Sequence, residues 1–178
     1  MLTGSRVALR LVERGDVDAL VTLLAEPEVE RWWTPHDRAR IERELFDELD
    51  ADLTAYMITV DGEVVGLIES SEEPEADYRR ASIDIAVSTR WHGTGVAVDA
   101  LRTLIGHLIE VKGHHHLTID PAVENRRAIA CYEKVGFRAV GVLRQNERGA
   151  DGTFHDTFLM DLVADDWRRC ETGSDADA

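Results

Sequence analysis

The sequence predicts a single-domain fold of the α/β (α+β) class, with a mixed central sheet of about seven strands flanked by helices. Its 178 residues suit one domain with a core of its own, and no internal repeat or linker divides the chain. Strand and helix patterns alternate in the second half, which implies parallel neighbours there. Asp61 and Gly62 lie between two strand-like runs and predict a hairpin, so part of the sheet is expected to be antiparallel.

The first third of the chain is expected to form a strand and two helices. Residues 6–12 (RVALRLV) alternate apolar and polar side chains, as a half-buried strand does. Asp16 is expected to cap a helix over residues 17–26, which would end near the next proline. Pro35 limits any helix in the segment that contains two adjacent tryptophans, and a second helix is predicted over residues 41–50.

The middle of the chain is expected to form three strands. Residues 54–60 and 63–70 flank the Asp-Gly turn and form the predicted hairpin. Residues 71–80 (SEEPEADYRR) read as an acidic loop, and residues 81–87 (ASIDIAV) as the next strand.

The rest of the chain alternates helix and strand and ends with a pair of strands. The predicted elements are a helix over 96–111, a strand over 114–120, a helix over 124–137, strands over 137–145 and 153–163, and a short segment at 165–169. Gly136 is expected to close the second of these helices as a left-handed C-cap. We place the domain in residues 1–168 and expect residues 169–178 to form a disordered acidic tail.

The composition excludes several classes of protein. A net charge of −15 argues against binding nucleic acid and suits a cationic partner, although it serves solubility equally well. No apolar run reaches the roughly 20 residues of a membrane span, and the N-terminus lacks the apolar segment of a signal peptide. Cys131 and Cys170 do not suggest a disulfide framework. We therefore expect a cytoplasmic monomer or homodimer without a membrane or nucleic-acid partner.

Three consecutive histidines, His114, His115 and His116, do not predict a metal site. Adjacent residues of a strand point to alternate faces of a sheet, so the three side chains cannot all reach one ion. We expect them to form the start of a surface strand, and we expect no metal. Cys131 lies in a helical pattern and is expected in the core rather than as a nucleophile.

A glycine pair between a strand and a helix predicts an anion site. Gly93 and Gly95 separate the strand over 81–87 from the helix over 96–111. The first N–H groups of a helix have no intrahelical partner, and the helix dipole adds partial positive charge there. Glycine also lets a phosphate approach the backbone closely. The stretch lacks the lysine of a P-loop and the third glycine of a dinucleotide fingerprint, so it is neither of these motifs.

Two motifs resemble those of the GNAT superfamily of acyl-CoA N-acyltransferases. The run R-x-x-G-x-G, from Arg90 to Gly95, resembles the pyrophosphate-binding signature of that superfamily. The run N-x-x-A-x-x-x-Y-E-K-x-G-F, from Asn125 to Phe137, resembles the pattern on its last major helix. The order of the predicted elements matches as well, over nearly the whole chain. The resemblance implies a GNAT fold and an N-acetyltransferase that uses acetyl-CoA as its co-substrate.

The resemblance also implies which residues hold the co-substrate. The end of the strand before the turn would pair with the pantetheine arm in β-sheet fashion, and one N–H group there would polarise the thioester carbonyl. The turn would hold the phosphates, and the asparagine of the second motif would steady the arm from the far side. The implied cofactor-binding residues are Ile85, Ala86, Val87, Arg90, Trp91, His92, Gly93, Thr94, Gly95, Val96, Asn125, Ala128 and Tyr132.

Candidate catalytic groups follow from the same motif and from the chemistry of an amine. The motif implies that Tyr132 protonates the departing thiolate, although a tyrosine in an amphipathic helix is commonly a half-buried packing residue. The amine must lose a proton before it attacks, and a carboxylate is the natural base. Asp84 and Asp120 are the two main candidates, and Glu69 is a third. Asp84 also fits a solvated position on an open sheet face, and Asp120 fits a cap before Pro121.

Three features favour an aminoglycoside as the amine. The segment EVERWW resembles the paired-tryptophan segment of certain aminoglycoside 6′-N-acetyltransferases, and residues 120–137 are very close to a run of that subgroup. The negative charge would suit a polycationic sugar, and the acidic loop carries Glu72, Glu73, Glu75 and Asp77. We therefore expect the 6′-amine to attack the thioester directly in a ternary complex, an activity of antibiotic resistance. The expected substrate-site residues are Trp32, Trp33, Glu69, Asp84 and Asp120.

Other readings remain open at the level of the sequence. The two tryptophans also fit core or rim packing. Protein N-terminal acetyltransferases of the ribosomal-protein type and siderophore-lysine acyltransferases share parts of the same pattern. A non-catalytic acetyl-CoA-binding module and a purely structural domain are further classes. The presence of Tyr132 and of candidate bases counts against the module, and the second motif counts against the structural domain.

Overall fold

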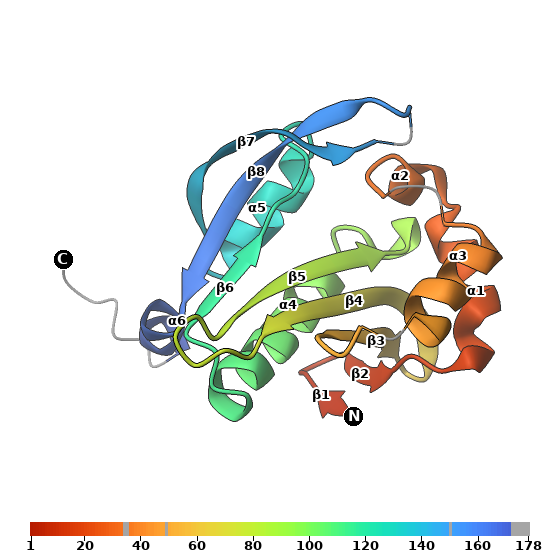
Figure 1. Cartoon of the computed structure of the whole chain (residues 1–178). Coiled ribbons are helices and arrows are strands. Elements are labelled where there is room, and N and C mark those ends of the chain that lie inside the picture. Colours follow the sequence, from red (N-terminus) through yellow and green to blue (C-terminus); the bar gives the residue numbers. More distant parts are fainter. Residues whose placement is uncertain (34–35, 49, 150, 172–178) are drawn as a thin grey trace.

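The chain folds around a single mixed sheet with helices on both of its faces (Figure 1). The structure is a computed structural model that describes residues 1–33, 36–48, 50–149 and 151–171. The strands lie in the order β1-β2-β3-β4-β5-β6-β8-β7. Their bounds are β1 Leu2–Thr3, β2 Ala8–Leu11, β3 Leu53–Val60, β4 Glu63–Glu73, β5 Arg80–Val87, β6 His116–Ile119, β7 Arg138–Arg148 and β8 Phe154–Val163.

The helices bury two apolar clusters, one on each face of the sheet. Their bounds are α1 Val17–Leu24, α2 Pro27–Glu30, α3 Arg38–Glu42, α4 Val96–Gly106, α5 Arg126–Lys134 and α6 Ala164–Glu171. One cluster joins α1, α2 and α3 to side chains such as Leu67 and Ala86. The other joins α4, α5 and α6 to side chains such as Ile68 and Ile83. Neighbouring strand residues point to opposite faces, so each central strand supplies both clusters.

The predicted mixed α/β fold is confirmed, with eight strands where about seven were expected. The additional strand, β1, is two residues long and pairs with β2 through Leu2 and Leu9, which is too short to show a hydrophobic period. The segment after β1 is fixed to α4 by Asp99. The carboxylate of Asp99 accepts hydrogen bonds from the N–H groups of Ser5, Arg6 and Val7, at 3.1, 2.7 and 2.9 Å.

The predicted hairpin is present between β3 and β4. Asp61 and Gly62 have φ values of +51° and +83°, the left-handed values that a tight hairpin turn requires. Val60 pairs with Glu63 on either side of the turn. The short Asp-Gly sequence therefore sets the register of the strand pair next to the turn, as far as the bulge between Ile58 and Thr59.

The expected parallel neighbours in the second half are confirmed for one pair, and the other strand pairs of the described residues are antiparallel. Strands β5 and β6 are parallel, and they pair only between residues 80–82 and 116–118. The other neighbour of β6 is β8, which is antiparallel to it, and β7 forms the edge of the sheet. Helix α5 carries the chain past the position of β8, so the following strand cannot be the next neighbour of β6.

Two of the predicted helices end in a π-helical turn instead of continuing as an α-helix. The helix predicted over 96–111 is α4 followed by a π-helical turn at His107–Val111. The helix predicted over 41–50 is α3, which begins at Arg38, followed by a π-helical turn at Arg43–Asp47. The helix predicted over 17–26 is shorter, because α2 begins at Pro27 after a break. The predicted effect of Pro35 lies outside the described residues.

Asp16 begins α1 but does not cap it with its side chain, which corrects the predicted role. Its carboxylate instead receives the guanidinium of Arg10 at 2.6 and 2.7 Å, and the N–H of Glu13 at 2.9 Å. The hydrogen bond from Arg10 holds the pKa of Asp16 below its usual value, although burial acts in the opposite direction. This contact ties β2 to the start of α1.

The three histidines at the start of β6 are not all on the surface, in contrast to the expectation. His114 is 3% exposed, and its Nε2 lies 2.8 Å from an oxygen of Glu72. His116 lies 3.2 Å from the carboxylate of Asp161 on β8. The Nε2 atoms of His114 and His116 thus face protein carboxylates, and the described residues contain no group of three side chains placed to hold a metal ion.

Regular structure continues past residue 168, the predicted end of the domain. Helix α6 continues to Glu171, so the first residues of the predicted tail are helical. Residues 172–178, which make up the rest of that tail, lie outside the described residues. In the part of the chain that is described, no helix is both long enough and apolar enough to cross a membrane.

Candidate active site

Strands β5 and β6 diverge beyond their short pairing and leave backbone groups of β5 without a strand partner (Figure 1). Ser88 N donates to Val65 O at 2.9 Å, in register with the pairing of Val87 and Gly66. In an antiparallel pair the hydrogen-bonded residues alternate, so the backbone of Ala86 pairs with β4. The N–H and C=O groups of Ile85 and Val87 therefore point toward β6, which does not pair with β5 at this level. The groups of Ile85 and the N–H group of Val87 can pair with an extended ligand, whereas Val87 O already lies 2.8 Å from His92 Nε2.

The glycine turn is built at the end of this open strand. Gly93 and Gly95 have φ values of +75° and +90°, which side chains other than glycine rarely adopt. Gly95 is the N-cap residue of α4, so the first N–H groups of that helix start at the turn. A Cβ added to Gly93 would meet no atom within 4 Å, so the space beside it is open.

Side chains of the turn mostly stabilise the turn itself. His92 Nε2 lies 2.8 Å from Val87 O, and Thr94 Oγ1 donates to Trp91 O at 2.7 Å. Arg90 forms an ion pair with Glu63, which draws its guanidinium away from the open side of the turn. The side chains of Arg90 and Thr94 are thus engaged within the protein, whereas the backbone beside Gly93 is open. Arg6 reaches the same turn from the segment between β1 and β2 and donates to the Thr94 carbonyl.

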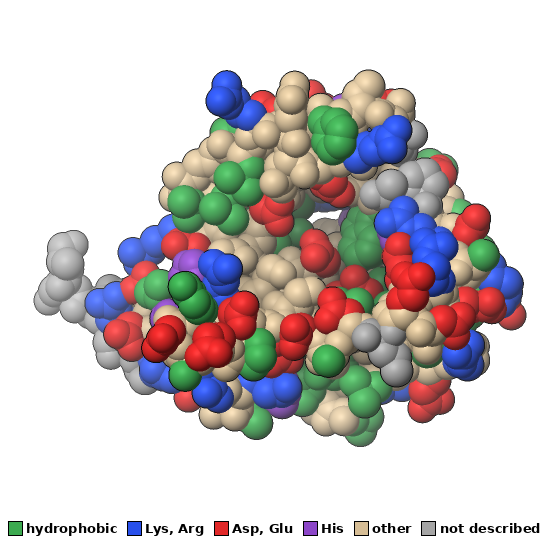
Figure 2. Space-filling view, viewed as in Figure 1, with side chains coloured by type: hydrophobic (Ala, Val, Ile, Leu, Met, Phe, Trp, Pro, Cys, Tyr) green, Lys and Arg blue, Asp and Glu red, His purple; other side chains and the backbone are tan. Residues whose placement is uncertain are grey.

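A cavity of about 590 Å³ connects the glycine turn with the gap between β5 and β6. Figure 2 shows the molecule hollowed between β7–β8 and β4–β5, with acidic side chains around the opening. The following predicted site residues line the cavity: Trp32, Trp33, Glu69, Asp84, Ile85, Ala86, Val87, Trp91, His92, Gly93, Gly95, Asp120, Asn125, Ala128 and Tyr132. Arg90, Thr94 and Val96 do not line it, and Val96 is buried in the core.

Tyr132 lies on the buried face of α5. Its side chain is 7% exposed, and its ring meets the ring of Phe137 edge to face at 6.3 Å. Burial raises the pKa of Tyr132 above its ordinary value, and the nearby Cys131, Asp84 and Asp120 act in the same direction. The phenol therefore remains protonated at neutral pH, as a proton donor must.

Asn125 caps α5 at the edge of the cavity. Its side-chain oxygen accepts a hydrogen bond from Ala128 N at 3.1 Å, which satisfies one of the free N–H groups of the helix. The side-chain NH₂ group of Asn125 then remains as the donor that can face a ligand. Gly136 ends the same helix with a φ of +104°, as predicted.

Asp84 and Glu69 are directly opposite each other on β5 and β4. Side chains paired in this way share one face of the sheet, and both line the cavity. Asp84 is open to the cavity and solvent-exposed, as expected of an open sheet face, but the surrounding protein partly desolvates its carboxylate. This desolvation raises the pKa of Asp84 to about 6, helped by the charges of Asp120 and Glu147. Burial also raises the pKa of Glu69 to about 7, helped by the charges of Asp84 and Glu44. Both groups can exchange a proton close to neutral pH.

Asp120 differs from Asp84 because its carboxylate is already held. Its Oδ2 receives Asn146 Nδ2 at 2.8 Å and Thr157 Oγ1 at 3.1 Å. Burial raises the pKa of Asp120, and these two hydrogen bonds act against that rise by favouring the charged form. Among the described residues, no donor reaches either oxygen of Asp84. Of the two main candidate bases, Asp84 is therefore the one whose carboxylate accepts no hydrogen bond from the described residues.

The structure adds acidic and cationic residues that the sequence did not reveal. Glu28 and Glu147 bring further carboxylates to the wall, and Arg127 and Lys134 bring cations from α5. Glu28 lies four residues before Trp32, so the segment already identified contains it. By contrast, the position of Glu147 depends on an irregularity in β7, which no local pattern indicates. The predicted acidic loop begins later than expected, because Glu72 and Glu73 end β4. Its acidic residues do not contribute, since Glu72, Glu73, Glu75 and Asp77 do not line the cavity.

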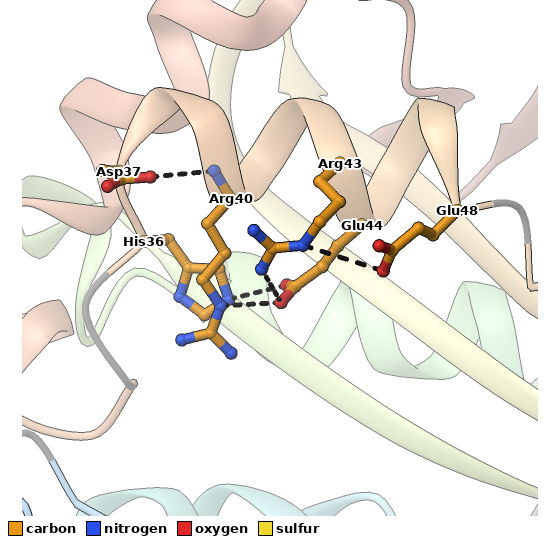
Figure 3. A network of polar contacts seen from close by, with 6 residues as sticks. All are labelled: His36, Asp37, Arg40, Arg43, Glu44 and Glu48. Carbon is orange, nitrogen blue, oxygen red and sulfur yellow. Dashed lines mark hydrogen bonds and ion pairs between the residues drawn. The ribbon is translucent and has the colours of Figure 1, made fainter.

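A network of charged groups around α3 and the π-helical turn that follows it lies beside the wall that carries the tryptophans (Figure 3). Glu44 receives Arg40 at 2.7 Å, Arg43 at 3.5 Å and His36 at 3.4 Å. His36 lines the cavity, and its ring lies 6.0 Å from that of Trp33. The negative charge of Glu44 is therefore shared among three partners, whereas the cavity carboxylates Asp84 and Glu69 have no cationic partner among the described residues.

Comparison with known proteins gives one consistent family. Residues 6–138 match the acetyltransferase (GNAT) domain family. The spermidine N(1)-acetyltransferase of Escherichia coli is 29% identical over 164 residues, which cover 90% of this chain and 87% of that protein. The aminoglycoside N(6′)-acetyltransferase type 1 of Klebsiella pneumoniae is 26% identical over 157 residues, which cover 79% of this chain and 78% of that protein.

A solved structure of similar shape holds coenzyme A. It is that of the aminoglycoside acetyltransferase AAC(6′)-Ib in complex with coenzyme A, which is 25% identical to this chain with a TM-score of 0.78. The similarity covers 93% of this chain and 99% of that one.

Proposed function

Because this chain belongs to the acetyltransferase (GNAT) family, and is thus an N-acetyltransferase, we propose that it acetylates a primary amine of a small polycation. The observation that carries this proposal is the charge of the cavity wall. Five carboxylates line it, those of Glu28, Glu69, Asp84, Asp120 and Glu147. Only two arginine or lysine side chains, Arg127 and Lys134, oppose them there. A substrate with several ammonium groups supplies the missing positive charge.

The residues of the site fit acetyl-CoA as the co-substrate. The backbone N–H and C=O groups of Ile85 and the N–H group of Val87 suit the amides of a pantetheine arm, and the open side of Gly93 suits a phosphate. Trp91 Nε1 and His92 Nδ1 are buried without a hydrogen-bond partner among the described residues, so both nitrogens of the turn can hydrogen-bond to a ligand. In this arrangement acetyl-CoA supplies the activated acetyl group, and the protein supplies position and protons.

The proposed reaction needs one group to accept a proton and another to donate one. Asp84, which is ionised above pH 6 or so and unengaged, takes a proton from the substrate ammonium. The freed amine nitrogen forms the new bond to the acetyl carbon, and the carbon–sulfur bond breaks. Tyr132 gives its proton to the departing thiolate, and an N–H group of Ile85 or Val87 stabilises the oxyanion. The nitrogen loses its second proton as the amide forms, and this proton, passed through solvent, restores Tyr132. The proton on Asp84 then returns to solvent.

Two forms of polycation are candidates within this proposal. Similarity to the Escherichia coli spermidine enzyme supports a linear polyamine. Similarity to the Klebsiella pneumoniae enzyme, together with the EVERWW segment, supports the 6′-amine of an aminoglycoside. An N-terminal peptide or a lysine derivative carries fewer positive charges, so the acidic wall favours it less.

The experiment is a measurement of CoA thiol release from acetyl-CoA with a panel of amines. The panel contains spermidine, spermine, kanamycin-like aminoglycosides, lysine derivatives and N-terminal peptides, with the Gly93→Glu variant as the control for background hydrolysis. We expect efficient release with a polyamine or an aminoglycoside and little with the peptides. Release that is efficient only with peptides or lysine derivatives contradicts the proposed substrate class and leaves the acetyltransferase chemistry intact.

A further inference from the structure

The edge strand β7 departs from regular pairing beside the cavity. Its register against β8 shifts between Leu143 and Glu147, so β7 bulges there. Within the bulge, Gln145 has a φ of +51°, a value that is unfavourable for a residue with a side chain. The N–H of Gln145 donates to the carboxylate of Asp156 at 2.8 Å, which holds the bulge in this shape. Backbone strain that the surroundings maintain in this way is frequent at functional sites.

The bulge places the next residue against Asp120. Asn146 Nδ2 lies 2.8 Å from Asp120 Oδ2 and 3.0 Å from Thr157 Oγ1. The hydroxyl of Thr157, a fully buried residue of β8, donates to the same Asp120 oxygen at 3.1 Å. Both donors therefore meet at Oδ2, and among the described residues none reaches Oδ1.

The backbone that follows Asp120 is also fixed to β8. Phe158 N donates to Pro121 O at 2.7 Å, and Val123 N donates to Asp156 O at 3.2 Å. Asp156 thus holds both the bulge, through its side chain, and the segment after Asp120, through its carbonyl. The position of the carboxylate is determined from two sides, although it lies on a loop.

We propose that the β7 bulge is a positioning device, in which Asn146 and Thr157 hold one oxygen of Asp120 so that the other anchors a substrate ammonium. Asn146 and Thr157 are positioning residues, because they act through Asp120. The inference rests on the proposed function, since it needs a cationic amine in the cavity. It separates the two carboxylates that the sequence could not distinguish, with Asp84 as the base and Asp120 as the anchor.

The charges around Asp120 explain why it needs two donors. Glu147 lines the same cavity, and after burial the charge of Asp120 is the main cause that raises the pKa of Glu147. The charge of Asp120 also acts on Asp84. A carboxylate among like charges tends to take up a proton, and a neutral Asp120 would lose its attraction for an ammonium. Hydrogen bonds to the charged form keep the anchor ionised.

The test compares near-isosteric variants that remove each donor and keep the shape, Asn146→Leu and Thr157→Val. Arg144→Ala is the control, because Arg144 is exposed on the same strand and makes no contact with Asp120. KM and kcat are measured at pH 6 and pH 8 with the amine that the wild-type protein acetylates best. We expect KM for the amine to rise about three- to tenfold at pH 6 and less at pH 8. The KM for acetyl-CoA should remain unchanged in both variants. In the control variant Arg144→Ala, both KM values should match those of the wild type.

A double variant decides whether Asn146 acts through Asp120. With Asp120→Asn as the background, Asn146→Leu should cause no further rise in the KM for the amine. An additive rise, or an equal change in both KM values, overturns the inference. Because Thr157 is buried, calorimetric binding of CoA to Thr157→Val establishes that this variant folds. If the wild-type protein acetylates no polycation, the proposed function fails; if it does and the variants match it, only the positioning role fails.

Discussion

At the scale of single residues, Tyr132 has the environment of a proton donor. It is buried beside Asp84 and Asp120, and this setting keeps the phenol protonated. We expect Tyr132→Phe to lower kcat by a factor of about 10²–10⁴, the usual contribution of a general acid. KM for acetyl-CoA should change little, because the ring and its contact with Phe137 remain. Steady-state kinetics with thiol detection measures both constants, and an unchanged kcat removes Tyr132 from the mechanism.

Asp84 should determine the acid limb of the pH profile. Desolvation and the charges of Asp120 and Glu147 raise its pKa to about 6, so it loses its charge as the pH falls through that value. Activity is therefore expected to fall below about pH 6. Asp120→Asn removes a neighbouring negative charge, which lowers the pKa of Asp84 and should move the limb to lower pH. A profile of kcat/KM from pH 5 to 8.5 measures the shift.

Glu69→Gln is the matched control for Asp84→Asn. Both variants remove a carboxylate from opposite positions of the same strand pair. Asp84→Asn should abolish most of the activity, and the remaining activity should no longer fall below about pH 6. Glu69→Gln should keep the fall in activity near pH 6. The reverse result would assign the base to Glu69.

At the scale of elements, the glycine turn and α4 should act as one phosphate-binding unit. Gly93→Glu and Gly95→Glu place a negative charge at the turn, in backbone conformations that only glycine adopts readily. Gly62→Ala is a control, because Gly62 also has a positive φ but lies in the β3–β4 turn, away from the cavity. Calorimetric titration with CoA should show no binding to the two glutamate variants and ordinary binding to the control. Normal binding to Gly93→Glu would contradict the assignment.

The contact between β2 and α1 should make stability depend on pH. The folded-state pKa of Asp16 is lower than its unfolded value, so this carboxylate stabilises the fold above about pH 4. That contribution is lost as the pH falls through the folded-state pKa. Asp16→Asn should therefore cost about 1–3 kcal/mol at pH 7, and the difference from wild type should shrink below pH 4. Urea unfolding at pH 7 and pH 3.5 measures it, and an equal loss at both values would show that charge plays no part.

Elements with a strong local pattern could be predicted from the sequence, and those set by distant contacts could not. The Asp61-Gly62 hairpin and the Gly136 cap follow from φ values that few residues adopt. Strand β1 and the π-helical turns have no such signal, because pairing with β2 and contacts with the sheet decide them. In the site, the two motifs predicted Tyr132 and the glycine turn. The positions of Glu147 and Asn146 follow from a bulge in β7, which depends on Asp156 eleven residues from Gln145.

At the scale of the whole molecule, a net charge of −15 should affect the two substrates in opposite ways. The cation is attracted to the protein and the CoA anion is repelled, and salt screens both interactions. Raising the salt concentration from about 50 to 500 mM, where the Debye length falls from roughly 14 to 4 Å, should raise the KM for a polyamine. The KM for acetyl-CoA should fall or stay constant. A KM for the polyamine that does not depend on salt would mean that the acidic wall does not attract the substrate.

The short parallel pairing of β5 with β6 also has a consequence for folding and local stability. Three residue pairs join a block of five strands, β1 to β5, to a block of three, β6 to β8. Each block is held internally by antiparallel ladders, so each can behave as a cooperative folding unit, with the seam between them opening first. Amide hydrogens of Ile85 and Val87 at that seam should exchange with deuterium faster than those of Asp84 and Ala86. The place where the two units share the fewest strand pairs is thus the place where, in the proposed function, acetyl-CoA would complete the sheet.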